Sequence, residues 1–331
     1  MLKSLPLLLV GLLTVSSVKS AEANEWRMAT LAPDGSAWMK VLRRGAKAIK
    51  EGTEGRVSLK FYAGGVQGDE KNVVRKLKLG QLDGAALTTV GLSLIEKSIR
   101  VLELPRLFQS IEEMDYVRNK MWPTFVKRFA KKGYRLGEPG DVGFLYLYTK
   151  SKVTSLDDLR SVKFWRGSED ALSGAFFKKL GLDGVPMGIP KVLSALQTGR
   201  VNGVANSPLG LLALQWHTSV SFSTSEPIAY ATGASIARVK KWESTAEADR
   251  ETMTKVQTAQ SAKLRRVVRK DNRKAQKALS RSIQTSSLEP AAQKAVNEAA
   301  EWVWKNLSGK QYSAEDLANV LKYRAEFRAK K

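Results

Sequence analysis

The stretch LKLGQLDGAALTT (residues 77–89) returns as LQTGRVNGVANSP (residues 196–208). Each copy follows a segment whose apolar residues recur at three- and four-residue spacing, which predicts a helix. Gly80 and Gly199 then stand where a helix ends and a residue that tolerates positive φ is favoured. A short run of small apolar residues follows and predicts a buried strand. Unless the likeness is chance, the repeat predicts two α/β lobes built on one plan.

Both copies end in polar residues at equivalent positions. Thr88 and Thr89 close the first predicted strand, and Asn206 and Ser207 close the second. Ligands of doubly wound sheets bind beyond the carboxyl ends of the strands. We therefore expect these four residues to face one crevice from opposite lobes.

The N-terminus has the pattern of a signal peptide. A basic residue, Lys3, precedes an apolar run over about residues 5–15, and small residues follow near position 20. The run is too short to span a bilayer. We predict that residues 1–23 are removed and that the mature protein is periplasmic, with a retained membrane anchor as the alternative. The absence of cysteine excludes lipidation at a cysteine and disulfides.

The chain is strongly basic, with 55 Lys and Arg against 32 Asp and Glu and a formal charge of +23. The densest run, residues 263–281, has nine basic residues, and its apolar residues fall on one face at helical spacing. This predicts a long amphipathic helix packed on a domain. A surface for anionic partners or lipid headgroups is the alternative. Export argues against nucleic acid as a partner.

Strand-like and helix-like segments alternate, which favours parallel sheets. The pattern restarts near residues 143–150, and from about Thr245 the sequence is almost wholly helical. We predict lobe I from residues 24–145 plus about 232–262. Lobe II is predicted from residues 146–231 plus about 263–331, which include spanning and C-terminal helices. Short crossing segments between lobes are the plan of a hinged clamp.

Six motifs occur in an order that resembles the solute receptors of tripartite ATP-independent periplasmic (TRAP) transporters, the DctP family. They are ATLAPDGSAWMKVLR (29–43), FYAGGVQGDE (61–70), LGQLDGAALTTVGL (79–92), SLDDLRSVKFWRGSEDALSGAFFKKLG (155–181), VPMGIPKVLSALQTGRVNGVANSP (185–208) and GLLALQW (210–216).

The resemblance implies a fold and a function. The fold is an α/β clamshell of the type II periplasmic-binding-protein kind, with crossing strands and long C-terminal helices. Its two lobes close on a small solute, usually an organic acid, and deliver it to a membrane permease that the receptor contacts peripherally. The alternative is an exported basic interaction protein that kept the clamshell and binds an anionic envelope component or a sensor partner.

The chain departs from the family pattern at two positions. Trp165 stands where many members have an arginine that pairs with the solute carboxylate, and Tyr146 replaces a second arginine. Arg166 follows Trp165, but a shift by one residue turns a strand side chain to the other face unless a bulge intervenes. A subgroup with tryptophan in place of the arginine looks closer to this chain. Asn206 matches the family's asparagine.

From these positions we expect an aromatic pocket less dedicated to acids. Trp165 and Tyr146 form flat walls, Asn206 and Thr88 offer hydrogen bonds, and Arg166 is the candidate anchor for an anion. Trp38, after the first predicted strand, and Asn72, in the helix after the glycine-rich turn, are further candidates, and for both a structural role is the favoured interpretation.

The sequence has few residues and motifs that are typical of catalytic sites. The chain has one histidine, His217, without a Gly-x-Ser-x-Gly elbow, and its glycine-rich turn lacks the lysine of a P-loop. No spacing of ligands indicates a zinc or calcium site. We predict a binding protein that is not an enzyme and that holds no cofactor and no dedicated metal.

Overall fold

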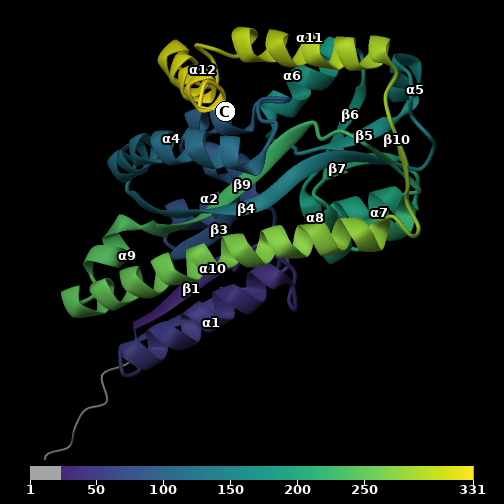
Figure 1. Cartoon of the computed structure of the whole chain (residues 1–331). Coiled ribbons are helices and arrows are strands. Elements are labelled where there is room, and N and C mark those ends of the chain that lie inside the picture. Colours follow the sequence, from purple (N-terminus) through teal and green to yellow (C-terminus); the bar gives the residue numbers. More distant parts are fainter. Residues whose placement is uncertain (1–23, 331) are drawn as a thin grey trace, which may run out of the picture.

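The computed structural model describes residues 24–330, and its strands form one mixed sheet (Figure 1). The predicted signal peptide lies outside the described residues. The strand order is β2-β1-β3-β9-β4-β7-β5-β6, with β8 beside β4 and β10 beside β8. The strands are β1 (Asn24–Thr30), β2 (Val57–Tyr62), β3 (Gly84–Thr88), β4 (Tyr134–Thr149), β5 (Lys163–Arg166), β6 (Asp183–Pro186), β7 (Gly203–Asn206), β8 (Phe222–Thr224), β9 (Ala229–Arg238) and β10 (Gln284–Ser286).

The long strand β4 joins the two halves of the sheet. Its residues from Tyr134 to Leu145 pair with β9, and its residues from Tyr146 to Thr149 pair with β7. We call the half with β2, β1, β3 and β9 lobe I, and the half with β7, β5 and β6 lobe II. Strands β4 and β9 pass through the centre of the molecule (Figure 1).

The prediction of parallel sheets is correct only within each lobe. Strand β1 lies parallel to β2 and β3, and β5 lies parallel to β6 and β7. At the centre, β9 is antiparallel to β3 and β4, and β4 is antiparallel to β7. The crossing strands return between the lobes without a helical crossover, and antiparallel pairing needs none.

The repeated unit has the same local structure in both lobes. Helix α2 (Glu70–Lys78) precedes β3, and helix α7 (Val192–Gln197) precedes β7. Gly80 and Gly199 follow these helices with φ of +73° and +72°. The predicted helix ends are therefore confirmed.

The remaining helices cover the sheet. They are α1 (Ala37–Gly52), α3 (Thr89–Ser93), α4 (Ile111–Lys131), α5 (Leu156–Ser161), α6 (Ala171–Leu180), α8 (Pro208–Ala213), α9 (Val239–Glu243), α10 (Glu247–Leu279), α11 (Pro290–Asn306) and α12 (Ala314–Arg328), with the 3-10 turns η1 (Lys97–Glu103), η2 (Ile189–Lys191) and η3 (Trp216–Ser219).

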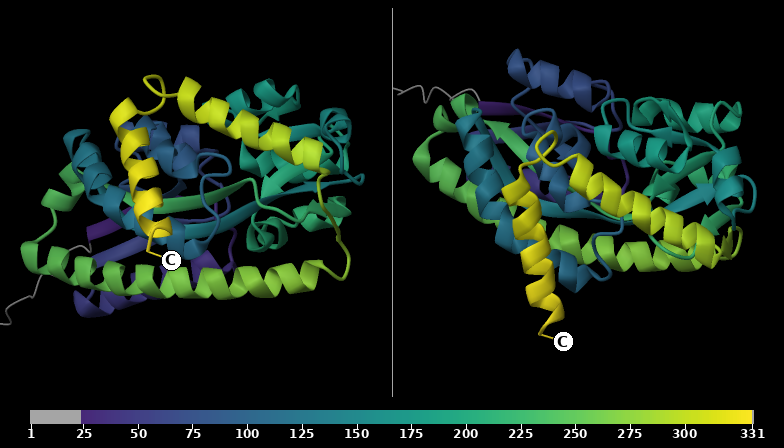
Figure 2. Two further views of the ribbon diagram at one scale, coloured as in Figure 1. Left: turned by 45° about the horizontal axis from the view of Figure 1, so that its top comes forward. Right: turned by 90° about the horizontal axis from the view of Figure 1, so that it is seen from above.

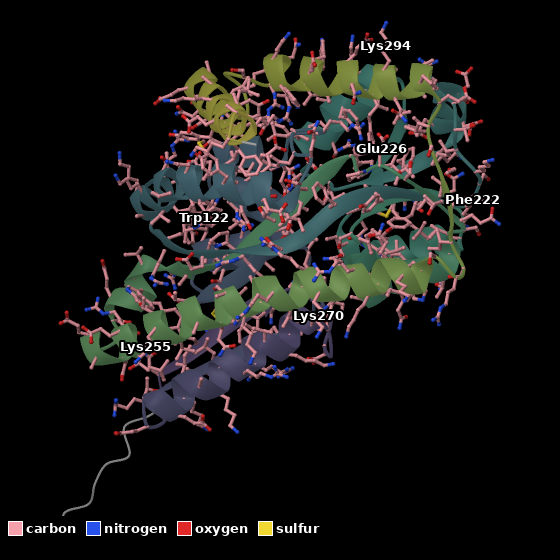
Figure 3. The ribbon with its side chains drawn as sticks, in the orientation of Figure 1. Trp122, Phe222, Glu226, Lys255, Lys270 and Lys294 are labelled. Carbon is pink, nitrogen blue, oxygen red and sulfur yellow. The ribbon has the colours of Figure 1, made fainter. Side chains whose placement is uncertain are left out.

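Helix α10 contains the basic run and spans both lobes. It packs on α1, β4 and α8 through buried residues that include Met253, Val268 and Leu279. The labelled side chains of Lys255 and Lys270 are exposed on it (Figure 3). The predicted amphipathic helix is confirmed.

The C-terminal helices return over the other side of the sheet (Figure 2). Helix α11 packs on α6, and α12 packs on α4. Ser313 and Asp316 form a capping box at the start of α12. The ion pairs Arg128–Asp316 (2.8 Å) and Arg328–Glu113 (2.5 Å) hold α12 against α4, although the sequence groups this segment with lobe II.

Candidate functional site

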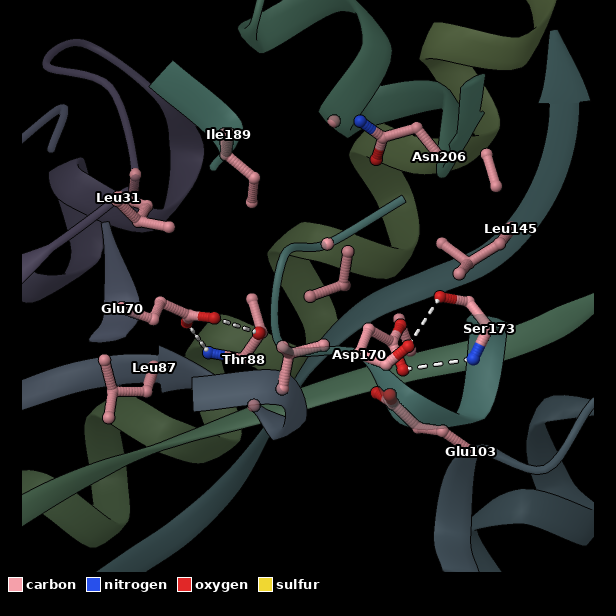
Figure 4. Close-up of a pocket in the computed structure, with 18 of the residues that line it drawn as sticks. Leu31, Glu70, Leu87, Thr88, Glu103, Leu145, Asp170, Ser173, Ile189 and Asn206 are labelled. Carbon is pink, nitrogen blue, oxygen red and sulfur yellow. Dashed lines mark hydrogen bonds between the residues drawn. The ribbon is translucent and has the colours of Figure 1, made fainter. Parts of the chain in front are cut away.

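A cavity of about 370 Å³ lies between the two lobes (Figure 4). This volume is typical of pockets for small organic molecules. Lobe I contributes Thr88 at the end of β3, and lobe II contributes Asn206 at the end of β7. The labelled side chains of Thr88 and Asn206 lie on different sides of the space (Figure 4). The two ends of the repeat therefore line one cavity, and their contact with a solute stays a prediction.

Trp165 and Trp38 also line the cavity, and both use their indole N–H groups on the protein backbone. Trp165 Nε1 donates to Met187 O at 2.9 Å, and Trp38 Nε1 donates to Asp141 O at 3.2 Å. The Trp165 ring meets Trp216 edge to face, with centroids 5.1 Å apart. These contacts leave the indoles apolar surface to offer a solute.

Arg166 lines the cavity, but its guanidinium is occupied. Its Nε donates to Gly184 O at 3.2 Å, and its Nη1 donates at 3.4 Å to the carbonyl oxygen of Gly167. These backbone contacts fix the group beside β6. Its Nη2 donates to no partner among residues 24–330, so binding of an anion by Arg166 stays a prediction.

Four of the predicted residues are not among those that line the cavity. Thr89 is fully buried and accepts a hydrogen bond from Arg100 at 3.2 Å. Ser207 is buried, and its hydroxyl caps α8 by accepting from Gly210 N at 3.1 Å. Both therefore have structural roles next to the two strand ends.

Tyr146 and Asn72 are the other two. Tyr146 pairs with Asn206 across the β4–β7 ladder and packs against the apolar core of lobe II. Asn72 is exposed on α2 and donates to Asp69 Oδ1 at 3.0 Å. Of the two residues predicted to form an aromatic wall, Trp165 lines the cavity and Tyr146 does not, and contact of either with a solute stays a prediction.

Sequence reasoning missed a buried group of charges at the cavity. We call Arg100, Glu103, Asp170 and Glu70 the charge cluster; all four line the cavity. Arg100 in η1 of lobe I pairs with Glu103 and also donates to Asp170 Oδ1, at the start of α6 in lobe II, at 2.7 Å. The contact with Asp170 joins the lobes inside the cavity.

Glu70 sits beside the end of β3. Its carboxylate accepts from Thr88 N at 2.6 Å and from the Thr88 hydroxyl at 2.8 Å. Burial raises the pKa of Glu70 to about 7, although these hydrogen bonds oppose the shift. Burial also raises the pKa of Glu103. Burial therefore disfavours the ionised forms of both carboxyl groups in the cavity wall.

The lobes meet across the mouth of the cavity. Lys71 of α2 pairs with Glu169 at 2.7 Å. Gly188 and Gly65 allow closer approaches, because a Cβ at Gly188 would lie 2.9 Å from Asp69 Cβ, and one at Gly65 would lie 2.9 Å from Pro190 Cγ. The structure is therefore that of a closed clamshell.

Solved structures support the two-lobed fold. The chain is 19% identical to DctP7 of Bordetella pertussis, an extracytoplasmic solute receptor binding pyroglutamic acid, with a TM-score of 0.84 over 91% of this chain and 99% of that one. It is 19% identical to the sugar acid binding protein DctPAm of Advenella mimigardefordensis in complex with galactonate, with a TM-score of 0.85 over 92% and 98%. The predicted α/β clamshell is confirmed.

A family model shows the family, and relatives in sequence are similar to part of the chain. A solute-binding protein of Chromohalobacter salexigens is 29% identical over 198 residues, which span 59% of this chain and 59% of that relative's length. In residues 24–330 no helix combines the length and the apolar character that a bilayer crossing requires. The model of the bacterial extracellular solute-binding proteins of family 7 matches residues 28–311. The chain therefore belongs to this family, the DctP family.

Proposed function

We propose that the protein is the periplasmic solute receptor of a TRAP-type transporter. It captures a small organic solute between its lobes and delivers that solute to a membrane permease. The observation that carries this proposal is one cavity lined from both lobes, with Thr88 and Asn206 at equivalent strand ends. An organic acid is the first class to test, since solved relatives bind pyroglutamic acid and galactonate.

The family gives the setting. Its members bind small-molecule solutes, work with TRAP permeases and are solute receptors. We propose the same setting for this chain, with export to the periplasm and without catalysis. Its own permease partner would recognise the closed form, because closure brings the surfaces of both lobes into one arrangement.

Closure of the lobes provides a test of this function. Gly188 has φ of −72°, so alanine fits the backbone there, but its Cβ would crowd Asp69 of the other lobe. Gly188→Ala is expected to weaken solute binding by about 5- to 150-fold, because overpacking costs about 1–3 kcal/mol in the closed state. The measurement is the rise in melting temperature with succinate, galactonate, pyroglutamate and amino acids, followed by calorimetry on those that bind.

Gly174→Ala is the matched control, because the nearest atom to a Cβ there is 3.9 Å away, within lobe II. It should leave affinity unchanged. A bound solute at a hundredfold excess over its Kd stabilises the wild type by about 2.7 kcal/mol. If no compound raises the melting temperature of the wild type, the proposed function is wrong.

A further inference from the structure

The charge cluster holds fewer positive than negative side chains. It holds one cation, Arg100, and three carboxylates, on Glu103, Asp170 and Glu70. The side chains of Arg100 and Glu103 are 6% and 8% exposed, so water screens them poorly. Burying a carboxylate without a neighbouring cation is unfavourable in free energy. Protonation of Glu70 removes the negative charge of only one of the three carboxylates.

The rest of the cavity wall has one cation without a carboxylate partner among residues 24–330, Arg166, and the carbonyl oxygens of Gly184 and Gly167 hold it beside β6. Seven acidic residues line the cavity against three basic ones, in a chain whose total charge is +23. Asp141 is neutralised from behind by Arg118 and Arg269, each at 2.6 Å. Lys71 is engaged at the mouth with Glu169. The negative charge at the centre of the cavity therefore remains.

The hydrogen-bonding groups point the same way. The indole N–H groups of Trp38 and Trp165 donate to backbone carbonyls, and so do Nε and Nη1 of Arg166, which leaves Nη2 of Arg166 as its free donor group. By contrast, Asp170 Oδ2 accepts no hydrogen bond from residues 24–330, since Arg100 and the start of α6 bond to Oδ1. The labelled Asp170 lies in the cavity view near Glu103 and Ser173 (Figure 4). The site offers acceptors more readily than donors.

We propose that this cavity selects solutes that carry a cationic nitrogen, whose N–H groups donate to Asp170 of the charge cluster. Among organic acids the zwitterions bind, and the net anionic acids are rejected. The amide of Asn206 donates no hydrogen bond to residues 24–330 from its Nδ2, so it can receive the carboxylate end. Apolar side chains such as Trp165 and Phe176 hold the body of the solute. This inference rests on the proposed function.

The test uses compounds with matched carbon skeletons at pH 7.5. Phenylalanine and leucine are zwitterions, 3-phenylpropionate and 4-methylpentanoate lack the amino group, and phenethylamine and 3-methylbutylamine lack the carboxylate. Calorimetry is expected to give each zwitterion at least tenfold higher affinity than its matched carboxylate. Each amine should also bind more tightly than that carboxylate.

Asp170→Asn examines the residue itself. Asparagine keeps the helix cap of α6 but removes the charge, so the preference for the zwitterion should fall toward onefold. Asp157→Asn is the matched control, because Asp157 is an exposed lobe II acid with 90% side-chain exposure, and it should keep the full preference.

The outcomes separate this inference from the proposed function. Equal or tighter binding of the carboxylates or of succinate overturns the cationic preference and leaves the receptor function standing. So does an unchanged preference in Asp170→Asn. Stabilisation by sodium or calcium chloride alone, with no preference among the six compounds, also overturns it, because an inorganic cation then fills the place. Failure of all six to bind overturns it too.

Discussion

Replacing Arg100 with alanine is expected to lower the free energy of unfolding by about 3–5 kcal/mol. The change leaves Glu103 and Asp170 without their cation in a buried position, and removes the internal contact between η1 and α6. Chemical denaturation at pH 8, monitored by tryptophan fluorescence, measures the loss. At pH 5 the loss should be smaller, because burial raises the pKa of Glu103 and this carboxyl is then protonated more readily.

The control for this prediction is an arginine in an exposed pair. Arg43→Ala removes a 2.7 Å contact with Asp34 whose side chains are 54% and 67% exposed. Such pairs contribute about 0–1 kcal/mol. A loss for Arg100→Ala no larger than for Arg43→Ala would show that the charge cluster does not hold the closed structure together.

Glu70 is expected to make stability fall as the pH rises from about 4.5 to 7. Burial raises the pKa of Glu70 in the folded chain to about 7, above the ordinary glutamate value of 4.5. The folded state therefore binds this proton more tightly. The stabilisation is complete below the unfolded pKa and is lost as the pH rises through the folded pKa, by roughly 3 kcal/mol in all.

Glu70→Gln removes this titration and keeps an acceptor for Thr88 N. The stability of the variant relative to the wild type should therefore rise across the same pH window. Denaturation series at pH 4.5, 5.5, 6.5 and 7.5 measure it. A wild type and variant whose difference stays constant with pH would contradict the burial of an ionisable Glu70.

The local units of the fold could be predicted because their signals are local. The helix ends at Gly80 and Gly199 need only a run of helical spacing and a glycine. Strand β9 was missed: AYATGASIAR has few large apolar residues and becomes a strand because β3 and β4 flank it. The antiparallel centre of the sheet depends on this pairing.

The site was predictable in outline, and its charges were not. Trp165 and Asn206 line the cavity as a consequence of strand position, which the sequence pattern indicates. Arg100 and Asp170 are 70 residues apart and in different lobes, so nothing local in the sequence pairs them. Glu70 and Asp170 resemble ordinary acids at helix starts, and only burial distinguishes them.

The most direct measurement is the distance between the lobes in solution. The chain has no cysteine, so spin labels can be placed at Val66→Cys in lobe I and Gln197→Cys in lobe II, both exposed. Double electron–electron resonance should give a longer, broader distance distribution without solute. Saturation with the compound that raises the melting temperature most should give a shorter, narrower one. Identical distributions with and without that bound compound would contradict closure of the lobes around a solute.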